Sequence, residues 1–143
     1  MELPILYEDA DVIVVDKPAG VLTESLHYGI GHVHRLDKDT SGSLAFAKNQ
    51  AAYEFLRKAF TNREVKKEYL AFVYGVPKEK KGVIDFDIGR SRKDFRLRSA
   101  QPKAKGKLRA ALTRYEVISE DEGAKHALLK VFPESGRTHQ IRV

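Results

Sequence analysis

The chain has 143 residues, with 26 lysines and arginines against 20 aspartates and glutamates, and no cysteine. This length fits one domain with a buried core, and the lack of cysteine excludes disulfides, thiolate zinc sites and a thiol nucleophile. No apolar run is long enough for a membrane-spanning helix, and the first residues lack the basic and apolar parts of an export signal. We therefore expect a cytoplasmic protein with no membrane contact.

Two short strands are predicted near the N-terminus. Residues 5–7 and 12–15 are mostly apolar, and an acidic turn (EDAD) separates them. Proline and glycine in residues 16–20 (DKPAG) end the second strand.

The string HRLDKDTSG, residues 34–42, is the most informative part of the chain. It combines two carboxylates, two cations and a turn of small residues, and it is flanked by predicted strands at residues 33–36 and 43–47. Asp37 therefore lies near a strand end, where loops usually display reactive groups. A single aspartate in a turn more often only caps its own backbone, so the chemical interpretation depends on the whole string.

One helix and one long strand follow this motif. Asn49 is a predicted N-cap, and apolar residues recur at positions 52, 55, 56, 59 and 60, which predicts an amphipathic helix of about a dozen residues. Residues 65–74 (VKKEYLAFVY) are predicted as a strand. Because large apolar side chains occupy both sides of its alternation, we expect both faces to be covered.

The rest of the chain is predicted to be strands and a basic segment. A strand at 83–88 precedes the basic segment, and strands at 107–118 and 124–132 form an antiparallel pair. One helix among many strands indicates an α+β domain built on a mixed, mostly antiparallel sheet with few helices. The chain stops in residues 135–143 (SGRTHQIRV), which are dense in functional residue types. We expect a single domain over residues 1–143 that is truncated at its C-terminus.

Positive charge is concentrated between Arg90 and Arg114. Ten basic residues there oppose only Asp94, a net charge of +9, whereas the other 16 basic and 19 acidic residues leave the rest of the chain at −3. Such a concentration favours a polyanionic partner, because each phosphate contact releases condensed counterions. A solvent-exposed basic hairpin without a partner is the alternative.

Other chemistries find little support in the residues. His34 and Asp37 on an extended segment would point to different faces, and no histidine or carboxylate spacing predicts a metal site. Residues 29–31 (GIG) lack the helix and the Lys-Ser/Thr pair of a phosphate-binding loop. Asp37 and Asp39 could be compared with a glycosidase pair, but such carboxylates stand about 5–10 Å apart and usually come from different elements.

Four segments, in order, resemble the RluA family of RNA pseudouridine synthases. They are VIVVDKPAG, HRLDKDTSG, a K-x-Y-x-A-x-V-x-G strand from Lys67 to Gly75, and SGRTHQIRV. The resemblance runs from about Leu6 to Val143. It implies a pseudouridine synthase-like catalytic domain, without the N-terminal RNA-binding domain of some relatives, that isomerises specific uridines in ribosomal or transfer RNA. No cofactor is implied, because the isomerisation transfers no net electrons and consumes no water.

The resemblance also implies roles for individual residues. Asp37 is the catalytic aspartate, which attacks the target nucleotide or takes a proton from it while uracil is detached at N1 and re-attached through C5. Tyr69 packs on the flipped base, and Arg137 pairs with the aspartate. A cation is needed there, because burial alone raises the pKa of a carboxyl group. Core packing for Tyr69 and a surface position for Arg137 are the alternatives.

RNA is the expected partner of what we expect to be a monomer. Arg35 is a candidate for a phosphate contact or for filling the gap left by a flipped base, with a surface salt bridge as the alternative. His34 and His139 are expected to orient loops by hydrogen bonds. The competing functions are a non-catalytic RNA-binding module with the same fold and a protein–protein adaptor. The complete set of predicted RNA-binding residues is Arg35, Arg90, Arg92, Lys93, Arg96 and Arg98.

Only residues 21–33 separate the DKPAG turn from the HRLD string, whereas family members usually have a longer segment there. That region bears on RNA binding, so substrate choice does not follow from the motifs.

Overall fold

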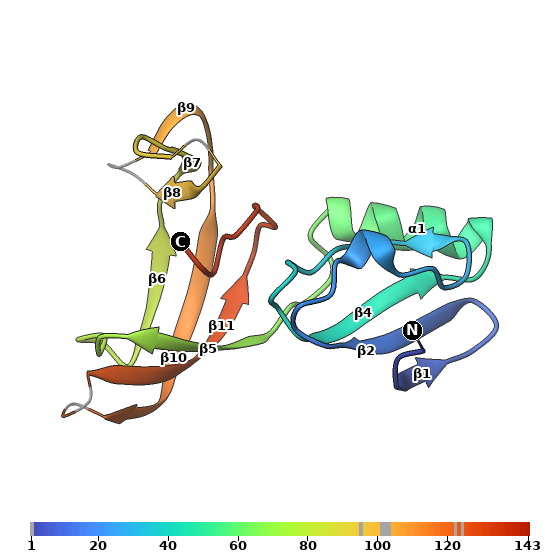
Figure 1. Cartoon of the computed structure of the whole chain (residues 1–143), viewed down its shortest axis with the longest axis horizontal. Helices are drawn as coiled ribbons and strands as arrows, with labels where there is room; N and C mark the ends of the chain where they lie inside the picture. The colour runs from blue at the N-terminus through green and yellow to red at the C-terminus, as the bar shows by residue number, and fades with distance from the viewer. Residues whose placement is uncertain (1, 95, 101–103, 122, 124) are drawn as a thin grey trace. The chain divides into compact units, whose positions relative to one another are not determined.

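The computed structural model describes residues 2–94, 96–100, 104–121, 123 and 125–143. The chain divides into two compact units, Met1–Val65 and Lys66–Val143 (Figure 1). Every strand pairing among the described residues is antiparallel, and they contain one α-helix. The predicted α+β class with mostly antiparallel strands is confirmed, and the strands form three sheets.

The first unit is built on a four-stranded sheet in the order β1-β2-β4-β3. Its strands are β1 (Ile5–Glu8), β2 (Val12–Lys17), β3 (Gly31–His32) and β4 (Gly42–Ala47). Val15 pairs with Leu44 and Ile13 with Phe46, and all four side chains are buried because alternation along β2 and β4 turns them to the core face. The predictions for residues 5–7, 12–15 and 43–47 are confirmed.

The helix α1 (Gln50–Thr61) lies across one face of this sheet (Figure 1). It begins where predicted, because the Asn49 side chain accepts a hydrogen bond from the Ala52 N–H at 2.9 Å. Ala59 is buried, but Phe55 is 70% exposed, so the apolar stripe is only partly used in packing.

The predicted strand at residues 33–36 is wrong. β3 contains only Gly31 and His32, and after it the Val33 N–H still donates a hydrogen bond to the Ala45 carbonyl of β4 at 3.3 Å. The side chain of His34 takes the place of a strand partner, because its Nε2 accepts the hydrogen bond of the Ala45 N–H at 3.1 Å. The His34 side chain thus replaces the backbone pairing with β4 that the apolar pattern of residues 33–36 predicts.

The second unit contains a four-stranded sheet, β5-β11-β10-β6, and a three-stranded sheet, β8-β7-β9. The strands are β5 (Tyr69–Tyr74), β6 (Lys81–Asp85), β7 (Ile88–Ser91), β8 (Arg98–Ala100), β9 (Ala104–Arg109), β10 (Leu112–Asp121) and β11 (His126–Pro133). Ala127, Leu129 and Val131 of β11 form the buried core of the larger sheet.

Two strand predictions in this unit need correction. The strand predicted at 65–74 begins only at Tyr69, and one of its faces is open: Leu70, Phe72 and Tyr74 are 67%, 74% and 80% exposed. The side chains of β5 alternate between its two faces, and Tyr69, Ala71 and Val73 on the other face pack on the β11 core. Only one face of β5 is therefore covered.

The strand predicted at 83–88 is two strands, β6 and β7, which belong to different sheets. The antiparallel pair predicted near the C-terminus is confirmed as β10 and β11, although residues 107–109 belong to β9. Ala124, where the second strand of that pair was predicted to begin, lies outside the described residues.

Candidate active site

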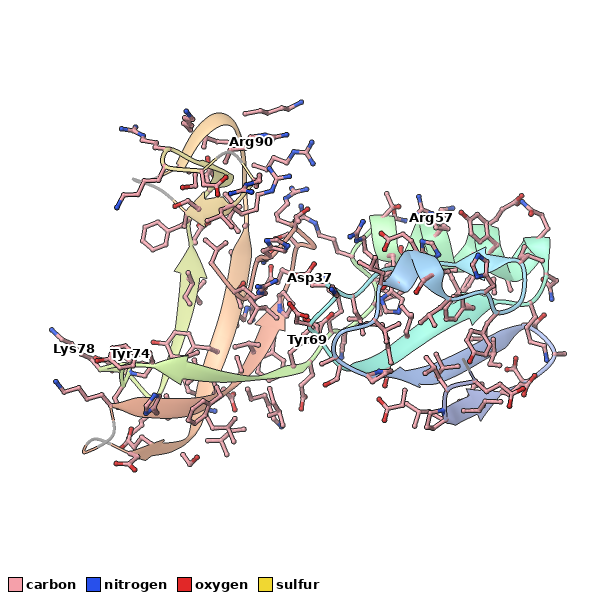
Figure 2. All side chains as sticks on the ribbon, viewed as in Figure 1. Asp37, Arg57, Tyr69, Tyr74, Lys78 and Arg90 are labelled. Atoms are coloured by element: carbon pink, nitrogen blue, oxygen red, sulfur yellow. The ribbon has the colours of Figure 1, made fainter. Side chains whose placement is uncertain are left out.

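Asp37 lies in the loop between β3 and β4 of the first unit (Figure 2). The Thr40 N–H donates a hydrogen bond to the Asp37 carbonyl at 3.0 Å, which closes a four-residue turn and confirms the turn predicted from the motif. The aspartate side chain is half-buried at the start of this turn.

A buried lysine supports the turn from one side. Lys17, the last residue of β2, has no exposed surface, and its Nζ donates to the carbonyls of Pro18 (3.0 Å), Val21 (2.7 Å) and Lys38 (3.0 Å). The Gly20 N–H also donates to the Lys38 carbonyl, at 2.9 Å. Glycine suits this position because its φ is +87°. The Lys38–Asp39 peptide unit, the second one after Asp37, is therefore held by two donors.

Burial lowers the pKa of the Lys17 ammonium, and the carboxylates of Asp39 and Asp37 partly oppose that shift. Lys17 belongs to the VIVVDKPAG motif, but no role is predicted for it from the sequence. Its burial could nevertheless have been predicted from the sequence. Ile13, Val15 and Lys17 occupy alternate positions along β2, so all three lie on the buried face of that strand.

A buried threonine holds the residue before Asp37. The Thr23 hydroxyl donates to the Leu36 carbonyl at 2.9 Å and accepts from the Leu36 N–H at 3.1 Å. Thr23 opens the short 3-10 helix η1 (Thr23–Ser25) and is fully buried. The loop is thus fixed on both sides of the aspartate by residues 17–23.

The neighbours of Asp37 in the motif have different roles. Besides its hydrogen bond to Ala45, His34 stacks its ring on Phe60, with centroids 4.6 Å apart, and these contacts agree with its predicted role in orienting a loop. Arg35 forms an exposed ion pair with Glu24 at 2.7 Å, which is the surface salt bridge kept as the alternative. Such pairs contribute only about 0–1 kcal/mol, so a phosphate could displace Glu24 at little cost.

Tyr69 and Arg137 both belong to the second unit. Tyr69 is the first residue of β5, pairs with Val131 and packs half-buried on the β11 core (Figure 2). Arg137 follows β11, and its Nε donates to the Ala110 carbonyl at 2.9 Å. Tyr69 therefore has a packing role in the fold, and the Arg137 side chain is tied to the backbone.

Gln140 organises the segment that carries Arg137. Its Oε1 accepts from the Arg137 N–H at 2.9 Å and the Ser135 hydroxyl at 2.8 Å. Its Nε2 donates to the Leu112 carbonyl at 3.1 Å and the Thr113 hydroxyl at 3.0 Å. The two Oε1 bonds therefore stay within residues 135–140, and the two Nε2 bonds join that segment to β10. This one side chain uses all its hydrogen-bonding positions, a role that the motif does not reveal.

The basic segment forms the sheet β8-β7-β9, on which Arg90 is exposed (Figure 2). Arg90 pairs with Arg98 on one side and with Lys105 on the other. Three basic residues are therefore in register across this sheet.

Arg92 and Lys93 lie exposed after β7, whereas Arg96 forms hydrogen bonds to both carboxylate oxygens of Asp94. This pairing lowers the pKa of Asp94 and raises the pKa of Arg96. Of the predicted RNA-binding residues in this segment, Arg96 is thus already neutralised.

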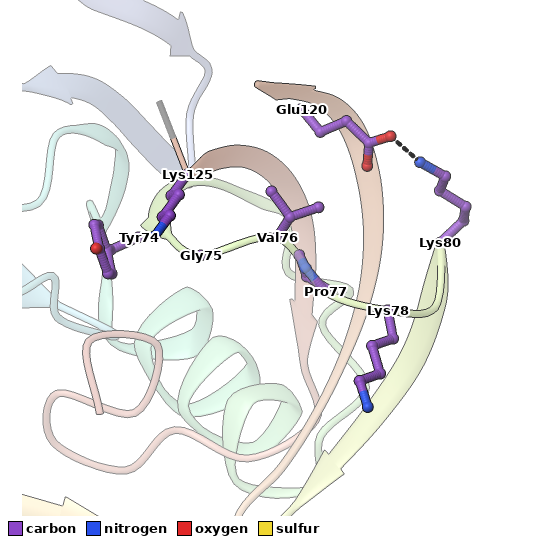
Figure 3. Close-up of a pocket in the computed structure, with 8 residues that line it drawn as sticks. All are labelled: Tyr74, Gly75, Val76, Pro77, Lys78, Lys80, Glu120 and Lys125. Carbon is purple, nitrogen blue, oxygen red and sulfur yellow. Dashed lines mark hydrogen bonds and ion pairs between the residues drawn. The ribbon is translucent and has the colours of Figure 1, made fainter. Parts of the chain in front are cut away.

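One pocket of about 440 Å³ lies in the second unit (Figure 3). Lys80 and Glu120 form an ion pair at its edge, and Tyr74 lies beside Lys125. Its lining residues are Tyr74, Gly75, Val76, Pro77, Lys78, Lys80, Glu120 and Lys125. None of the motif residues with a predicted catalytic role lines it.

Within the described part of the chain, no helix has the length and apolar character needed to cross a membrane. The same residues contain no group of three or more histidine, cysteine, aspartate or glutamate side chains arranged to hold a metal ion.

Comparison with known proteins defines the family. Residues 11–143 match the family described as RNA pseudouridylate synthase. The chain therefore belongs to that family, as the four motifs predicted.

Relatives at the sequence level have the same description. The chain is 34% identical to the uncharacterized RNA pseudouridine synthase YhcT of Bacillus subtilis, covering 99% of this chain and 53% of that protein. It is 40% identical to an uncharacterized RNA pseudouridine synthase of Chlorobaculum parvum, covering 99% and 50%. The chain spans about half the length of these curated relatives.

Solved structures also resemble the chain. Human RNA Pseudouridylate Synthase Domain Containing 1 is similar with a TM-score of 0.87 and 29% identity, covering 99% of this chain and 63% of that one. Human RNA Pseudouridylate Synthase Domain Containing 4 gives a TM-score of 0.77 and 27% identity, covering 97% and 62%. The fold is thus that of RNA pseudouridylate synthase domains.

Proposed function

We propose that this chain is the catalytic domain of an RNA pseudouridine synthase, and that Asp37 is its catalytic residue. The observation that most strongly supports a catalytic role for Asp37 is that buried side chains hydrogen-bond to the backbone of its loop. Thr23 holds the peptide group before Asp37, and Lys17 and Gly20 hold the Lys38 carbonyl in the second peptide group after it. A group that must meet a reacting atom in a defined geometry requires such preorganised support.

The proposed reaction moves one bond and needs no cofactor. Asp37 attacks the target nucleotide or takes a proton from it, and the bond between uracil N1 and ribose breaks. The detached base rotates and bonds to ribose through C5. C5 then loses its proton and N1 gains one, so atoms and electrons balance.

Tyr69 and Arg137 are proposed to assist Asp37. A tyrosine ring can stack on the face of a flipped uracil, and its place at the start of β5 gives that ring a fixed position. The Ala110 carbonyl binds Nε of Arg137, so the guanidinium retains its Nη1 and Nη2 groups as donors for a carboxylate.

The proposed partner is ribosomal or transfer RNA, bound by a monomer in the cytoplasm. Arg90, Arg98 and Lys105, which lie in register across the three-stranded sheet, support a polyanionic partner. With Arg92 and Lys93 beside them, they would contact phosphates without reading sequence. Arg35 would add a contact next to Asp37, and Arg96 would contribute least.

Measuring pseudouridine formation tests the proposal. The purified chain is incubated with RNA that carries tritium at uridine C5, and released tritium is counted, because isomerisation frees that hydrogen. We expect release by the wild-type chain and none by Asp37→Asn, which keeps the size of the side chain but removes its charge. Undiminished release by Asp37→Asn would disprove the role of Asp37.

A non-catalytic RNA-binding module is the second candidate, favoured by the basic sheet alone. It predicts RNA binding without tritium release by the wild-type chain. Mapping the uridines that stay unmodified in RNA from cells lacking the protein would identify the target RNA.

A further inference from the structure

Leu36, the residue before Asp37, has a main-chain N–H and C=O that are not hydrogen-bonded to a neighbouring strand. β3 ends at His32, and Leu36 is buried in the loop that follows. Buried N–H and C=O groups require partners, since an unpaired one is costly. For Leu36, both partners are the same atom, the Oγ1 of Thr23, with bonds of 3.1 Å and 2.9 Å.

Thr23 is chemically suited to this double task. A hydroxyl is at once a donor and an acceptor, so one small side chain can satisfy the N–H and the C=O of a single residue. Thr23 has no exposed surface, so water does not compete for these bonds. The two bonds resemble those of a β-ladder and replace the partner strand that the loop lacks.

The same short segment also holds the other side of Asp37. The Lys38 carbonyl accepts hydrogen bonds from Lys17 and Gly20, as described above. Residues 17–23 therefore hold the Leu36 carbonyl directly before Asp37 and the Lys38 carbonyl one residue after it. The Asp37 side chain can leave the backbone only in a narrow range of directions.

We propose that Thr23 is a positioning residue for Asp37. It would act through the Leu36 backbone and would not touch the RNA. This inference rests on the proposed catalytic role of Asp37. Loss of the hydroxyl would move the carboxylate away from the reacting nucleotide, and a misplacement of about 1 Å lowers catalysis roughly a hundredfold.

Thr23→Val is the direct test, because valine keeps the shape of threonine and removes both hydrogen bonds. We expect kcat for pseudouridine formation to fall roughly ten- to hundredfold, with KM for RNA changed less than about twofold. Thr23→Ser, which keeps the hydroxyl, should restore most of kcat. Ser25→Ala, which removes a hydroxyl from the same 3-10 helix without touching the Asp37 loop, should leave kcat unchanged.

Amide hydrogen exchange supplies a readout that does not depend on turnover. The Leu36 N–H should exchange slowly in the wild-type chain and in Thr23→Ser, and much faster in Thr23→Val. A residue that only stabilises the fold would change exchange throughout the first unit. If Thr23→Val does not fold, Thr23→Ala, which adds no bulk, must show the same local change and the same loss of kcat.

The outcomes separate the inference from the proposed function. If Asp37→Asn is inactive but Thr23→Val keeps the wild-type kcat, the positioning role is wrong and the proposed function stands. A loss of kcat with Leu36 exchange unchanged also overturns the positioning role. If Asp37→Asn and the wild-type chain release tritium equally, or neither does, the proposed function fails.

Discussion

The loop that carries Asp37 and the sheet β8-β7-β9 are both polar, but they are held in different ways. The loop is fixed by buried donors, Lys17 and Thr23, which bond to its backbone. The sheet presents Arg90 directly opposite Arg98 and Lys105. The comparison teaches that defined geometry in this chain comes from buried side chains that bind backbone, whereas the surface charge of the sheet would supply affinity for the proposed RNA without fixed geometry.

Replacing the buried lysine should have the largest effect. Lys17→Met removes all three hydrogen bonds of Nζ, and a hydrogen bond from a charged group contributes about 1.5–3 kcal/mol. We expect the free energy of unfolding to fall by about 2 kcal/mol or more in urea titrations. kcat should fall roughly a hundredfold, because the Lys38 peptide unit loses one of its two donors.

Lys48→Met is the matched control for this change. Lys48 pairs with Glu8 at the surface of the same unit, so its loss should cost less than about 1 kcal/mol. Equal destabilisation by the two lysine variants would contradict the special role of the buried one.

Removing two arginines from the basic sheet should weaken RNA binding without harming the chemistry. For Arg90→Gln combined with Arg98→Gln, the slope of log affinity against log salt should decrease by about 1.4 for single-stranded RNA. The rate at saturating RNA should stay at the wild-type value. Filter binding at several salt concentrations and single-turnover rates check this.

Arg96→Gln is the informative comparison, because Arg96 is already paired with Asp94. It should change the salt slope less than a change at the exposed Arg92, Arg92→Gln, does. An effect as large as that of Arg92→Gln would show that RNA displaces Asp94.

The smallest expected effect concerns Asp94 itself. Its hydrogen bonds from Arg96 lower its pKa below the ordinary value of 3.8. A carboxyl whose pKa is lowered by folding stabilises the fold above that ordinary value, and the contribution is lost as pH falls through the folded pKa. An NMR titration of Asp94 should show the low pKa, and Arg96→Gln should return it toward 3.8. An unchanged titration would mean that the pair does not form in solution.

Elements defined by local patterns could be predicted from the sequence. Asn49 and the apolar spacing after it located α1, and alternating residues located β2, β10 and β11. The predicted strand at 33–36 failed because the side chains of His34 and Thr23 replace strand partners, and such contacts leave no periodic signal. β5 was predicted with two covered faces because its residues are apolar on both sides, and composition cannot show which face finds a partner.

The site was only partly predictable for the same reason. The motifs singled out Asp37, Tyr69 and Arg137 as site residues, and these roles stay predictions. Lys17 could have been found from its position on the buried face of β2. Thr23 could not have been found in this way. Its importance depends on its contact with Leu36, which is thirteen residues away and lies outside the sheet.

The most direct test of the account is a single-turnover measurement with RNA pre-bound to saturating protein. Asp37→Asn is compared there with the Arg90→Gln/Arg98→Gln double variant. We predict that Asp37→Asn binds RNA as the wild-type chain does and forms no pseudouridine, whereas the double variant binds more weakly and reacts at the wild-type rate once saturated. Pseudouridine formation by Asp37→Asn at the wild-type rate would contradict the account.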